Sequence, residues 1–500
     1  MFRKVLVANR GEIAVRVLRA LREMNIASVA VYSEADRGSL AVRMSDEAIP
    51  IGPSPSSESY LSIDKILAAA QATGAEAIHP GYGFLSENAD FAEACEGAGV
   101  VFVGPPASSI RAMGSKIAAR KLAIAAGVPV VPGTEKPVSD PAEARRVAAA
   151  IGYPVLLKAS AGGGGKGMRL VESEADLDSA FRDASSEAER AFKSGEVYLE
   201  RAIRKPRHVE IQVLGDRSGH LIHLGERECS IQRRHQKVIE ECPSPLMAER
   251  PELRRQMGEA AVRAAKAAGY FNAGTVEFLV NEHGGFFFLE MNTRLQVEHP
   301  VTELVTARDL VHWQLRIAAG EKLTLEQNDI TWQGHAIECR IYAEDPDNQF
   351  YPSPGKILQL ERPAGPGIRL DSGVYQGWTV PLDYDPLLAK LAVWAEDRPQ
   401  AIERMLRALS EYYVAGITTN ISFFRRVLID SAFRAGRLHT GFLDDFFRRT
   451  SKPEPGHDER EAVAALVAAW HDARQQSAGN GSRPSEVSRW RAAGREDLLR

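Results

Sequence analysis

The sequence predicts a multidomain protein of the α/β and α+β classes, and three observations lead to this prediction. Short apolar strands alternate with helical stretches over roughly the first hundred residues, a pattern typical of a parallel sheet covered by helices. A dense glycine cluster at 161–168 follows a strand in the middle of the chain. Short strands and glycine-proline turns such as 363–367 dominate after Gly320. At about 100 to 200 residues per domain, the 500 residues allow three domains.

The N-terminal region is expected to form a parallel α/β layer. Residues 5–8 are an apolar run typical of a buried strand, and Ile13, Val17 and Leu21 then recur at helical spacing. Further strands are expected at 26–32, 77–78 and 100–103, with helices near 60–72 and 87–97. A nicotinamide-binding domain is the competing interpretation. The first turn, 9–14, argues against it, because it has one glycine where the dinucleotide fingerprint requires three.

The middle region is expected to combine helices with longer strands. A helix is expected over 116–126, and a strand should end at 156–158, just before the glycine cluster. Further strands are expected at 197–200, 208–214, 221–224 and 275–280. A turn at 281–285 joins the last of these to the apolar run 286–291, which predicts a hairpin.

The glycine cluster offers backbone N–H groups that no Cβ obstructs, which suits phosphate oxygens. It is not a Walker P-loop, because Ser160 stands where the first glycine is required and Gly167 stands where Ser or Thr should bind magnesium. Lys158 precedes the cluster, and Lys116 begins a predicted helix. Two lysines and a glycine-rich loop suit a triphosphate, whereas a flexible surface loop is the simpler alternative.

The segment 290–298 is the second concentration of chemically active side chains. In an extended chain the side chains alternate between two faces. Five polar side chains would then share one face: Glu290, Asn292, Arg294, Gln296 and Glu298. An amphipathic strand with one solvated face is the simpler interpretation. The strand begins with the apolar residues 286–289, however, so a carboxylate next to them needs a partner.

The predicted hairpin places Glu277 directly opposite Glu290. Two carboxylates about 5 Å apart across a ladder repel each other unless a cation lies between them. A magnesium ion held by Glu277, Glu290 and the Asn292 amide fits this arrangement. Arg294 and Glu298 would remain to hold a small oxyanion and to accept a proton from it.

A basic cluster at 227–237 is unusual in a chain with a net charge of −4. A solvated loop is the simpler interpretation. Beside a magnesium and phosphate site, the cluster would be the electrostatic partner of a transferred phosphoryl group. Arg340 alternates with apolar neighbours on a predicted strand and by itself is equally consistent with a structural ion pair.

The composition excludes several classes of protein. The chain has 62 Lys and Arg against 66 Asp and Glu, without a basic block that would bind nucleic acid or an anionic membrane. It has no apolar run of about 18 residues, so no membrane span is expected, and residues 5–8 are too short for a signal peptide. Four widely spaced cysteines argue against a disulfide framework or a zinc site. We expect a cytoplasmic protein.

Taken together, these motifs resemble biotin carboxylase, the ATP-grasp component of acetyl-CoA, propionyl-CoA and related acyl-CoA carboxylases. The likeness covers about residues 1–446 and rests on several segments: 9–14, 79–88, the glycine cluster, 227–237, 290–300 and 340–346. The resemblance implies a Rossmann-like N-terminal domain, an ATP-grasp domain with a mobile glycine-rich lid, and a mixed β-rich C-terminal domain. The implied boundaries are 1–114, 115–330 with the lid at about 131–204, 331–447, and a tail at 448–500 with a candidate partner-docking helix at 458–474.

The resemblance also implies roles for individual residues. ATP is expected to contact Lys116, Lys158, Gly164, Gly165, Met168, Glu200, Arg201, Ile203, His208, Gln232 and His235. Mg²⁺ or Mn²⁺ is expected on the groups that the hairpin argument selects, Glu277, Glu290 and Asn292. Bicarbonate and biotin are expected beside Lys237, Arg294, Gln296, Val297 and Arg340. The catalytic residues would be Lys237, Arg294, Arg340 and the general base Glu298.

The implied reaction is the MgATP-dependent carboxylation of biotin by bicarbonate through carboxyphosphate, the first half-reaction of an acyl-CoA carboxylase. The sequence has no Met-Lys pair, the usual setting of a biotinyl-lysine. Biotin is therefore expected as a substrate on a separate biotin carboxyl carrier protein, with a separate carboxyltransferase. The resemblance further implies a homodimer or a place in a larger carboxylase complex.

Two alternatives from other functional classes remain open at this point. Another ATP-grasp ligase would share the lysines, the glycine cluster and the paired glutamates, but would not need Arg340 or the segment 79–88. A catalytically silent scaffold of a carboxylase complex would be favoured by loss of an essential group. The retention of Glu277, Glu290, Arg294 and Glu298 argues against it.

Overall fold

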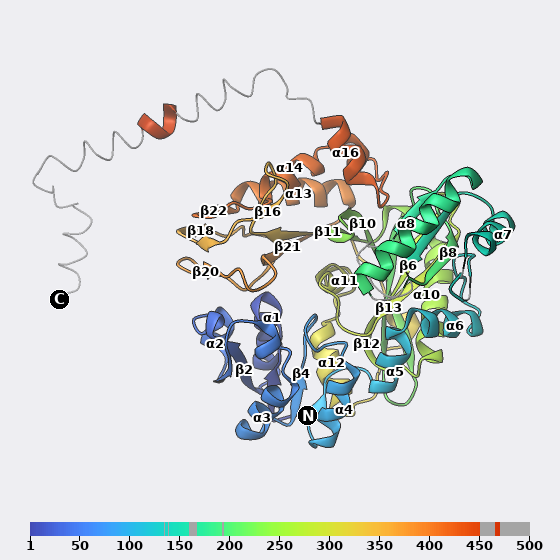
Figure 1. The fold of residues 1–500 in the computed structure, drawn as a ribbon. Coiled ribbons are helices and arrows are strands. Elements are labelled where there is room, and N and C mark those ends of the chain that lie inside the picture. The colour runs from blue at the N-terminus through green and yellow to red at the C-terminus, as the bar shows by residue number, and fades with distance from the viewer. Residues whose placement is uncertain (135, 139, 160–167, 193–194, 451–465, 471–500) are drawn as a thin grey trace, which may run out of the picture. The chain divides into compact units, whose positions relative to one another are not determined.

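A computed structural model gives the fold, which is drawn in Figure 1. It describes every residue except 135, 139, 160–167, 193–194, 451–465 and 471–500. The chain divides into two compact units, Met1–Leu443 and Asp444–Arg500. Among the described residues, no helix is both long and apolar enough to cross a membrane.

Residues 1–114, all of them described, contain a parallel sheet in the order β3-β2-β1-β4-β5. This part of the chain is drawn in blue in Figure 1. Its strands are β1 (Lys4–Val7), β2 (Ala27–Ser33), β3 (Glu47–Gly52), β4 (Ala77–His79) and β5 (Val101–Phe102). The helices are α1 (Gly11–Glu23), α2 (Leu40–Met44), α3 (Ile63–Thr73), α4 (Ala89–Gly97) and α5 (Ala107–Gly114). The predicted parallel layer is confirmed. β3 has no apolar run because it is an edge strand that is largely accessible to solvent.

The single glycine of the first turn has a conformational role. Gly11 has a φ of +63°, in the left-handed region that side chains with a Cβ rarely adopt. It begins α1, whose residues Ile13, Val17 and Leu21 are buried as their helical spacing predicts. The turn therefore directs the next residue, Glu12, toward the interior of the protein.

The largest sheet is antiparallel, in the order β13-β12-β9-β10-β11-β14-β21-β19. Its strands are β9 (Arg207–Gly215), β10 (Leu221–Arg233), β11 (Gln236–Cys242), β12 (Asn272–Val280), β13 (Phe286–Asn292), β14 (His335–Tyr342), β19 (Ile368–Ser372) and β21 (Leu387–Ala395). This sheet continues across position 330, where the resemblance implies a domain boundary. Side chains from both sides of that position can therefore share one face.

A second, smaller sheet has the order β7-β6-β8 and is also antiparallel. It consists of β6 (Val155–Ala159), β7 (Met168–Val171) and β8 (Val197–Arg201), packed against α7 (Pro141–Ile151) and α8 (Glu174–Phe192). Val155, Leu157, Val171 and Leu199 belong to a hydrophobic core of its own. This sheet lies within the segment predicted as a lid. The glycine cluster from 160 to 167 is outside the described residues, so lid motion stays a prediction.

Helices cover the large sheet and connect it to the N-terminal layer. They are α6 (Lys116–Ala125), α9 (Pro245–Glu249), α10 (Pro251–Ala267), α11 (His299–Thr306), α12 (Leu310–Ala318), α13 (Arg398–Glu411), α14 (Ile421–Leu428) and α15 (Ser431–Arg434). Val17 and Leu21 of α1 share a core with Leu310 and Leu315 of α12 and with Leu295. Burying Leu295 contributes about 2 kcal/mol and anchors the segment that carries the candidate site.

The remaining described elements lie in the C-terminal part of the chain. Short strand pairs are β15 (Glu344–Asp345) with β16 (Tyr351–Pro352), β17 (Gly355–Lys356) with β20 (Thr379–Val380), and β18 (Gln359–Glu361) with β22 (Tyr413–Ala415). Helix α16 (Phe442–Thr450) runs into the second unit. Of the candidate docking helix at 458–474, residues 466–470 are described; they are helical and exposed.

Candidate active site

The β12–β13 hairpin places Glu277 opposite Glu290, as the sequence predicts. The register shifts by one residue next to Glu277, so that Phe278 pairs with Phe288 on the side of the turn. The predicted pairing of Glu277 with Glu290 is therefore confirmed, but the residues nearer the turn pair one position out of that register. The shift lets both phenylalanines pack in the core while the two carboxylates remain opposite each other.

Three groups contact the carboxylate of Glu277, which is buried. Lys237 Nζ and His208 Nε2 each lie 2.7 Å from one of its oxygens, and Asn292 Nδ2 donates to Oε1 at 2.8 Å. Burial alone would raise the pKa of Glu277, but Lys237 and His208 hold it below its usual range. Burial, followed by the charge of Glu277, raises the pKa of Glu290. A divalent cation would remove this repulsion, so Glu277, Glu290 and Asn292 fit Mg²⁺ or Mn²⁺.

Glu298 lies at the centre of the site, and its side chain is fully buried just before α11. Lys237 Nζ lies 2.8 Å from Oε1, and Arg340 Nη2 lies 3.0 Å from Oε2. Burial would raise the pKa of the carboxyl, but Lys237 and Arg340 hold it well below its usual range. Each oxygen of Glu298 is therefore bound by a different cation.

Further buried carboxylates hold these two cations. Glu210 of β9 also contacts Lys237, and Glu240 of β11 accepts from Arg340 Nε at 2.6 Å. Burial raises the pKa of Glu240 to about 7, against the opposing effect of Arg340. The site is thus a network of alternating charges, in which β9, β11 and β14 of the large sheet carry the groups around Glu298.

The basic cluster at 227–237 is not a solvated loop. It forms the end of β10, a tight turn and the start of β11. Arg227 is fully buried and donates to Glu210 at 2.5 Å and to Gln212 at 2.8 Å. It supports Glu210, whereas Lys237 at the other end of the cluster contacts Glu298 directly. A single sequence does not show which side chains of a long buried strand turn inward.

The prediction that 290–298 form one extended strand is wrong beyond Asn292. β13 ends there, and the chain continues as a loop into α11. The loop still brings the polar side chains together. Arg294 Nη1 lies 3.1 Å from Gln296 Oε1, and its Nε donates to Glu87 at 2.8 Å. Gln296 is buried, and among the described residues its Nε2 finds no hydrogen-bond acceptor, which leaves a donor for a small oxyanion.

The predicted nucleotide residues fall into two groups on two sheets. On the small sheet, Lys158 Nζ lies 2.5 Å from Glu200, Met168 pairs with Lys158 in the strand register, and Arg201 is exposed at the end of β8. On the large sheet, Gln232 Nε2 lies 2.8 Å from His208 Nδ1. The remaining predicted positions are Lys116, exposed at the start of α6, Ile203, half-buried after β8, and His235, exposed in the β10–β11 turn. Gly164 and Gly165 are outside the described residues.

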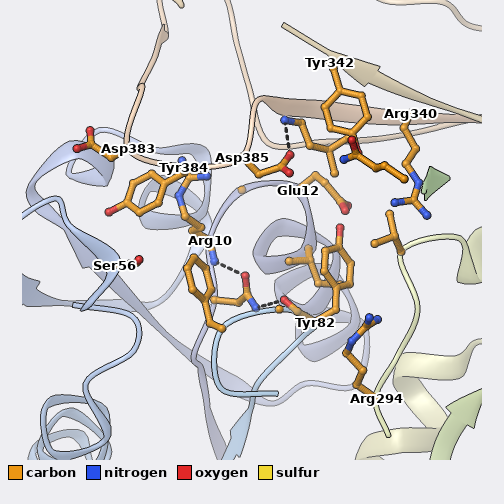
Figure 2. Close-up of a pocket in the computed structure, with 18 residues that line it drawn as sticks. Arg10, Glu12, Ser56, Tyr82, Arg294, Arg340, Tyr342, Asp383, Tyr384 and Asp385 are labelled. Carbon is orange, nitrogen blue, oxygen red and sulfur yellow. Dashed lines mark hydrogen bonds between the residues drawn. The ribbon is translucent and has the colours of Figure 1, made fainter. Parts of the chain in front are cut away.

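A cavity of about 460 Å³ opens beside Arg340. Figure 2 shows Arg340 and Arg294 at one end, Ser56, Asp383 and Tyr384 at the other, and Glu12 and Tyr82 between them. Sequence reasoning singled out the two arginines and Val297 but missed most of the lining: Glu12, Tyr82, Gln236, Tyr342 and Asp385. Four of them, Glu12, Tyr82, Gln236 and Tyr342, lie in the segments that carry the family resemblance. Residue spacing alone does not show which side chains of those segments line a cavity.

Comparison with known proteins shows which family the chain is similar to. The chain matches three families: "Biotin carboxylase, N-terminal domain" over 1–110, "Carbamoyl-phosphate synthase L chain, ATP binding domain" over 115–326 and "Biotin carboxylase C-terminal domain" over 338–445. The match at 338–445 favours biotin carboxylase over other ATP-grasp ligases.

Two relatives and one solved structure illustrate the similarity. The chain is 57% identical over 448 residues to a pyruvate carboxylase subunit of Methanothermobacter thermautotrophicus, covering 90% of this chain and 91% of that protein. It is 53% identical over 448 residues to biotin carboxylase of Halalkalibacterium halodurans, covering 90% and 98%. The biotin carboxylase domain dimer of Hydrogenobacter thermophilus 2-oxoglutarate carboxylase, solved with MgADP and bicarbonate, superimposes with a TM-score of 0.83 at 49% identity, covering 89% of this chain and 98% of that one. The chain therefore belongs to the biotin carboxylase family.

Proposed function

We propose that this chain carboxylates biotin with MgATP and bicarbonate, and that Glu298 is the general base of the reaction. One observation carries the assignment of roles. The carboxylate of Glu298 is bound by Lys237 on one oxygen and by Arg340 on the other, next to a cavity large enough for a small substrate. A general base therefore lies beside cations that would stabilise two anions in turn, first bicarbonate and then the enolate of biotin.

Bicarbonate is expected to bind beside Glu298, between Lys237, Arg294 and the orphaned amide of Gln296. Lys237 and Arg340 stabilise the ionised Glu298 and make it a weak base. An incoming anion competes for Lys237 and Arg340, and this competition raises the basicity of Glu298. Glu298 then takes the bicarbonate proton as the bicarbonate oxygen attacks the γ-phosphorus of ATP, and the bond from that phosphorus to the β–γ bridging oxygen breaks to release ADP.

The product of that attack is carboxyphosphate, which separates into CO₂ and phosphate. The phosphate removes the ureido proton of biotin, and the Arg340 guanidinium stabilises the enolate that captures CO₂. The cavity beside Arg340 is the proposed biotin site, with Val297, Tyr82 and Gln236 in its wall. Burial of this end of the site limits the access of water, to which carboxyphosphate is sensitive.

ATP is expected to bind between the two sheets, with Lys116 and Lys158 neutralising its phosphates. Glu277, Glu290 and Asn292 would hold Mg²⁺ or Mn²⁺, which supplies further positive charge to the phosphate oxygens. His208 and Gln232 orient each other on the large sheet and are the proposed ribose and purine contacts there, together with Glu200, Arg201, Ile203 and His235. The proposed metal site is supported by the pairing of Glu277 with Glu290.

We further propose that biotin arrives on a separate carrier protein and leaves for a separate carboxyltransferase. This proposal is supported by a relative that is named as one subunit of a carboxylase. A homodimer is proposed because the solved relative is described as a dimer. A cytoplasmic location is proposed because Cys95, Cys229, Cys242 and Cys339 are all buried free thiols, as expected in a reducing compartment.

The final acceptor of the carboxyl group is proposed to be an acyl-CoA, as the resemblance implies. Pyruvate is the second candidate, because the relative with 57% identity belongs by name to a pyruvate carboxylase. Transfer assays with the co-purified carboxyltransferase, supplied in turn with acetyl-CoA, propionyl-CoA and pyruvate, distinguish these acceptors.

The test of the proposed function is ADP release by the purified chain with MgATP and bicarbonate, with and without free biotin. We expect turnover that requires bicarbonate and rises when biotin is added. ATP binding without any turnover, even after a biotinylated carrier protein is supplied, would instead indicate a silent scaffold.

A further inference from the structure

Lys390 is a buried cation next to the bicarbonate segment, and none of the roles proposed above uses it. It lies on β21, and its side chain is fully inaccessible to solvent. Its Nζ donates to the backbone carbonyl of Val297 at 2.8 Å. Glu12 Oε1 of α1 lies 3.3 Å from the same nitrogen, and Asp371 Oδ2 of β19 lies 3.9 Å from it. Three separate parts of the chain therefore meet at one ammonium group.

Glu12 is the acid partner that depends most on Lys390. Its carboxylate is buried, and within the described part of the chain neither of its oxygens accepts a hydrogen bond of good geometry. Asp371, by contrast, is held by Arg369 at 2.8 Å. Glu12 also forms part of the wall of the cavity between Arg340 and Tyr82, as Figure 2 shows.

A buried ion pair of this kind is a poor source of stability, because the desolvation of two charges offsets most of their attraction. Its position offers a better explanation. Val297 lies between Gln296 and Glu298, the proposed bicarbonate donor and the proposed base, and β13 has already ended before this loop. The loop backbone at Val297 is therefore outside the strand ladder, and Lys390 supplies a contact that holds it.

We propose that Lys390 is a positioning residue for the bicarbonate segment, and that Glu12 holds Lys390 in place. Through the Val297 carbonyl, Lys390 sets the backbone from which the Gln296 amide and the Glu298 carboxylate reach the substrate. Glu12 thereby links the N-terminal parallel layer to the chemistry on the large sheet. The inference rests on the proposed role of residues 296–298 in bicarbonate binding.

The test uses Lys390→Met, which removes the donor but keeps the length of the side chain. Misplacement of a donor by about 1 Å can cost up to about 100-fold in rate, so we expect KM for bicarbonate to rise about ten- to a hundredfold. KM for ATP should change less than about twofold, because the nucleotide groups lie elsewhere. Lys390→Arg keeps a cationic donor and should recover part of the bicarbonate affinity.

Lys4 offers a matched control. Its Nζ also donates to a backbone carbonyl, that of Thr73, at 2.7 Å and pairs with Glu47 at 2.7 Å, but it lies on β1 away from the site. Lys4→Met should leave both KM values unchanged. Glu12→Gln should raise KM for bicarbonate less than Lys390→Met, and should add little to it in the double variant, since both act through one contact.

Several results would overturn the inference. If Lys390→Met raises the two KM values equally, or lowers thermal stability while KM for bicarbonate stays as in the wild type, Lys390 has a structural role only. If Lys390→Met does not fold, Glu12→Gln carries the comparison, and an unchanged KM for bicarbonate in Glu12→Gln would contradict the inference. Absence of bicarbonate-dependent ATPase in the wild-type chain would instead contradict the proposed function itself.

Discussion

The two ends of the site are held in different ways. At the nucleotide end, Lys158 is 27% exposed and pairs with Glu200 on a small sheet that has its own core. At the carboxylation end, the side chain of Glu298 is fully buried and bound by Lys237 and Arg340 from two strands of the large sheet. In the proposed assignment, a bulky nucleotide that must enter and leave would meet this separate layer. The proton transfer and the capture of CO₂ would take place among side chains that already hold one another.

This difference has a physical reason. A charge network is costly to bury, and it keeps its geometry only when every member has a partner. Glu210 and Glu240 supply these partners for Lys237 and Arg340. Such preorganisation lets the site stabilise developing charge without rearranging during the reaction. Four variants test the contrast, from the largest expected effect to the smallest.

Glu298→Gln should lower bicarbonate-dependent ATP turnover by about 10²- to 10⁴-fold, because the general base is lost while the shape of the side chain is kept. Nucleotide affinity should stay close to that of the wild type, because the exposed end of the site is unchanged. ADP release and equilibrium binding of an ATP analogue measure the two effects. Full turnover in this variant would remove Glu298 from its proposed role.

Arg340→Ala should lower biotin carboxylation by about 10²- to 10³-fold, because enolate stabilisation is lost. Bicarbonate-dependent ATP cleavage should fall much less. Arg398→Ala is the matched control, since Arg398 also pairs at 2.7 Å with a buried glutamate of β11, Glu241, but lies outside the proposed site. The control should change both activities in the same ratio. An equal loss of both activities in Arg340→Ala would return Arg340 to a structural or phosphate-binding role.

Lys158→Met should raise KM for ATP by about ten- to a hundredfold, the range expected for one charge-assisted hydrogen bond to phosphate. KM for bicarbonate should stay nearly constant, because Lys158 and Glu298 lie at opposite ends of the proposed site. Initial rates with each substrate varied in turn measure this split. Parallel changes in both constants would mean that the two ends are mechanically coupled.

Glu241→Gln should leave activity at pH 7 nearly unchanged while destabilising the fold, because Glu241 is buried with charged partners but outside the site. Burial alone would raise the pKa of Glu241, but Arg398 and His335 hold it at about 2. A depressed carboxyl pKa adds stability that is fully present above its unfolded value near 4.5 and is lost as the pH falls through the folded value.

The variant should therefore lose about 3 kcal/mol of unfolding free energy at pH 7, and its difference from the wild type should narrow below pH 4.5. Urea denaturation at pH 7, 5 and 3.5 measures the difference. A gap that widens on acidification would contradict the assigned charge state of Glu241.

Much of the site could be predicted from the sequence because its main parts are local. The pairing of Glu277 with Glu290 follows from one hairpin, although the register shifts by one residue between the turn and the carboxylates. The sequence does not reveal that the strand ends at Asn292, because the polar alternation continues through the loop that follows. The sequence likewise does not show that Arg227 is buried behind Glu210 while Lys237 contacts Glu298, because a buried strand and a solvated loop can have the same basic composition.

By itself the sequence determined the family, the N-terminal parallel layer and the paired carboxylates. These features depend on periodicity, on short-range turns and on motifs that stay close together along the chain. Only the tertiary structure decided which cations bind each oxygen of Glu298, and that Glu12 and Lys390 meet at the carbonyl of Val297. These contacts join residues tens to hundreds of positions apart, and burial across the shared sheet and its neighbouring helix brings them together.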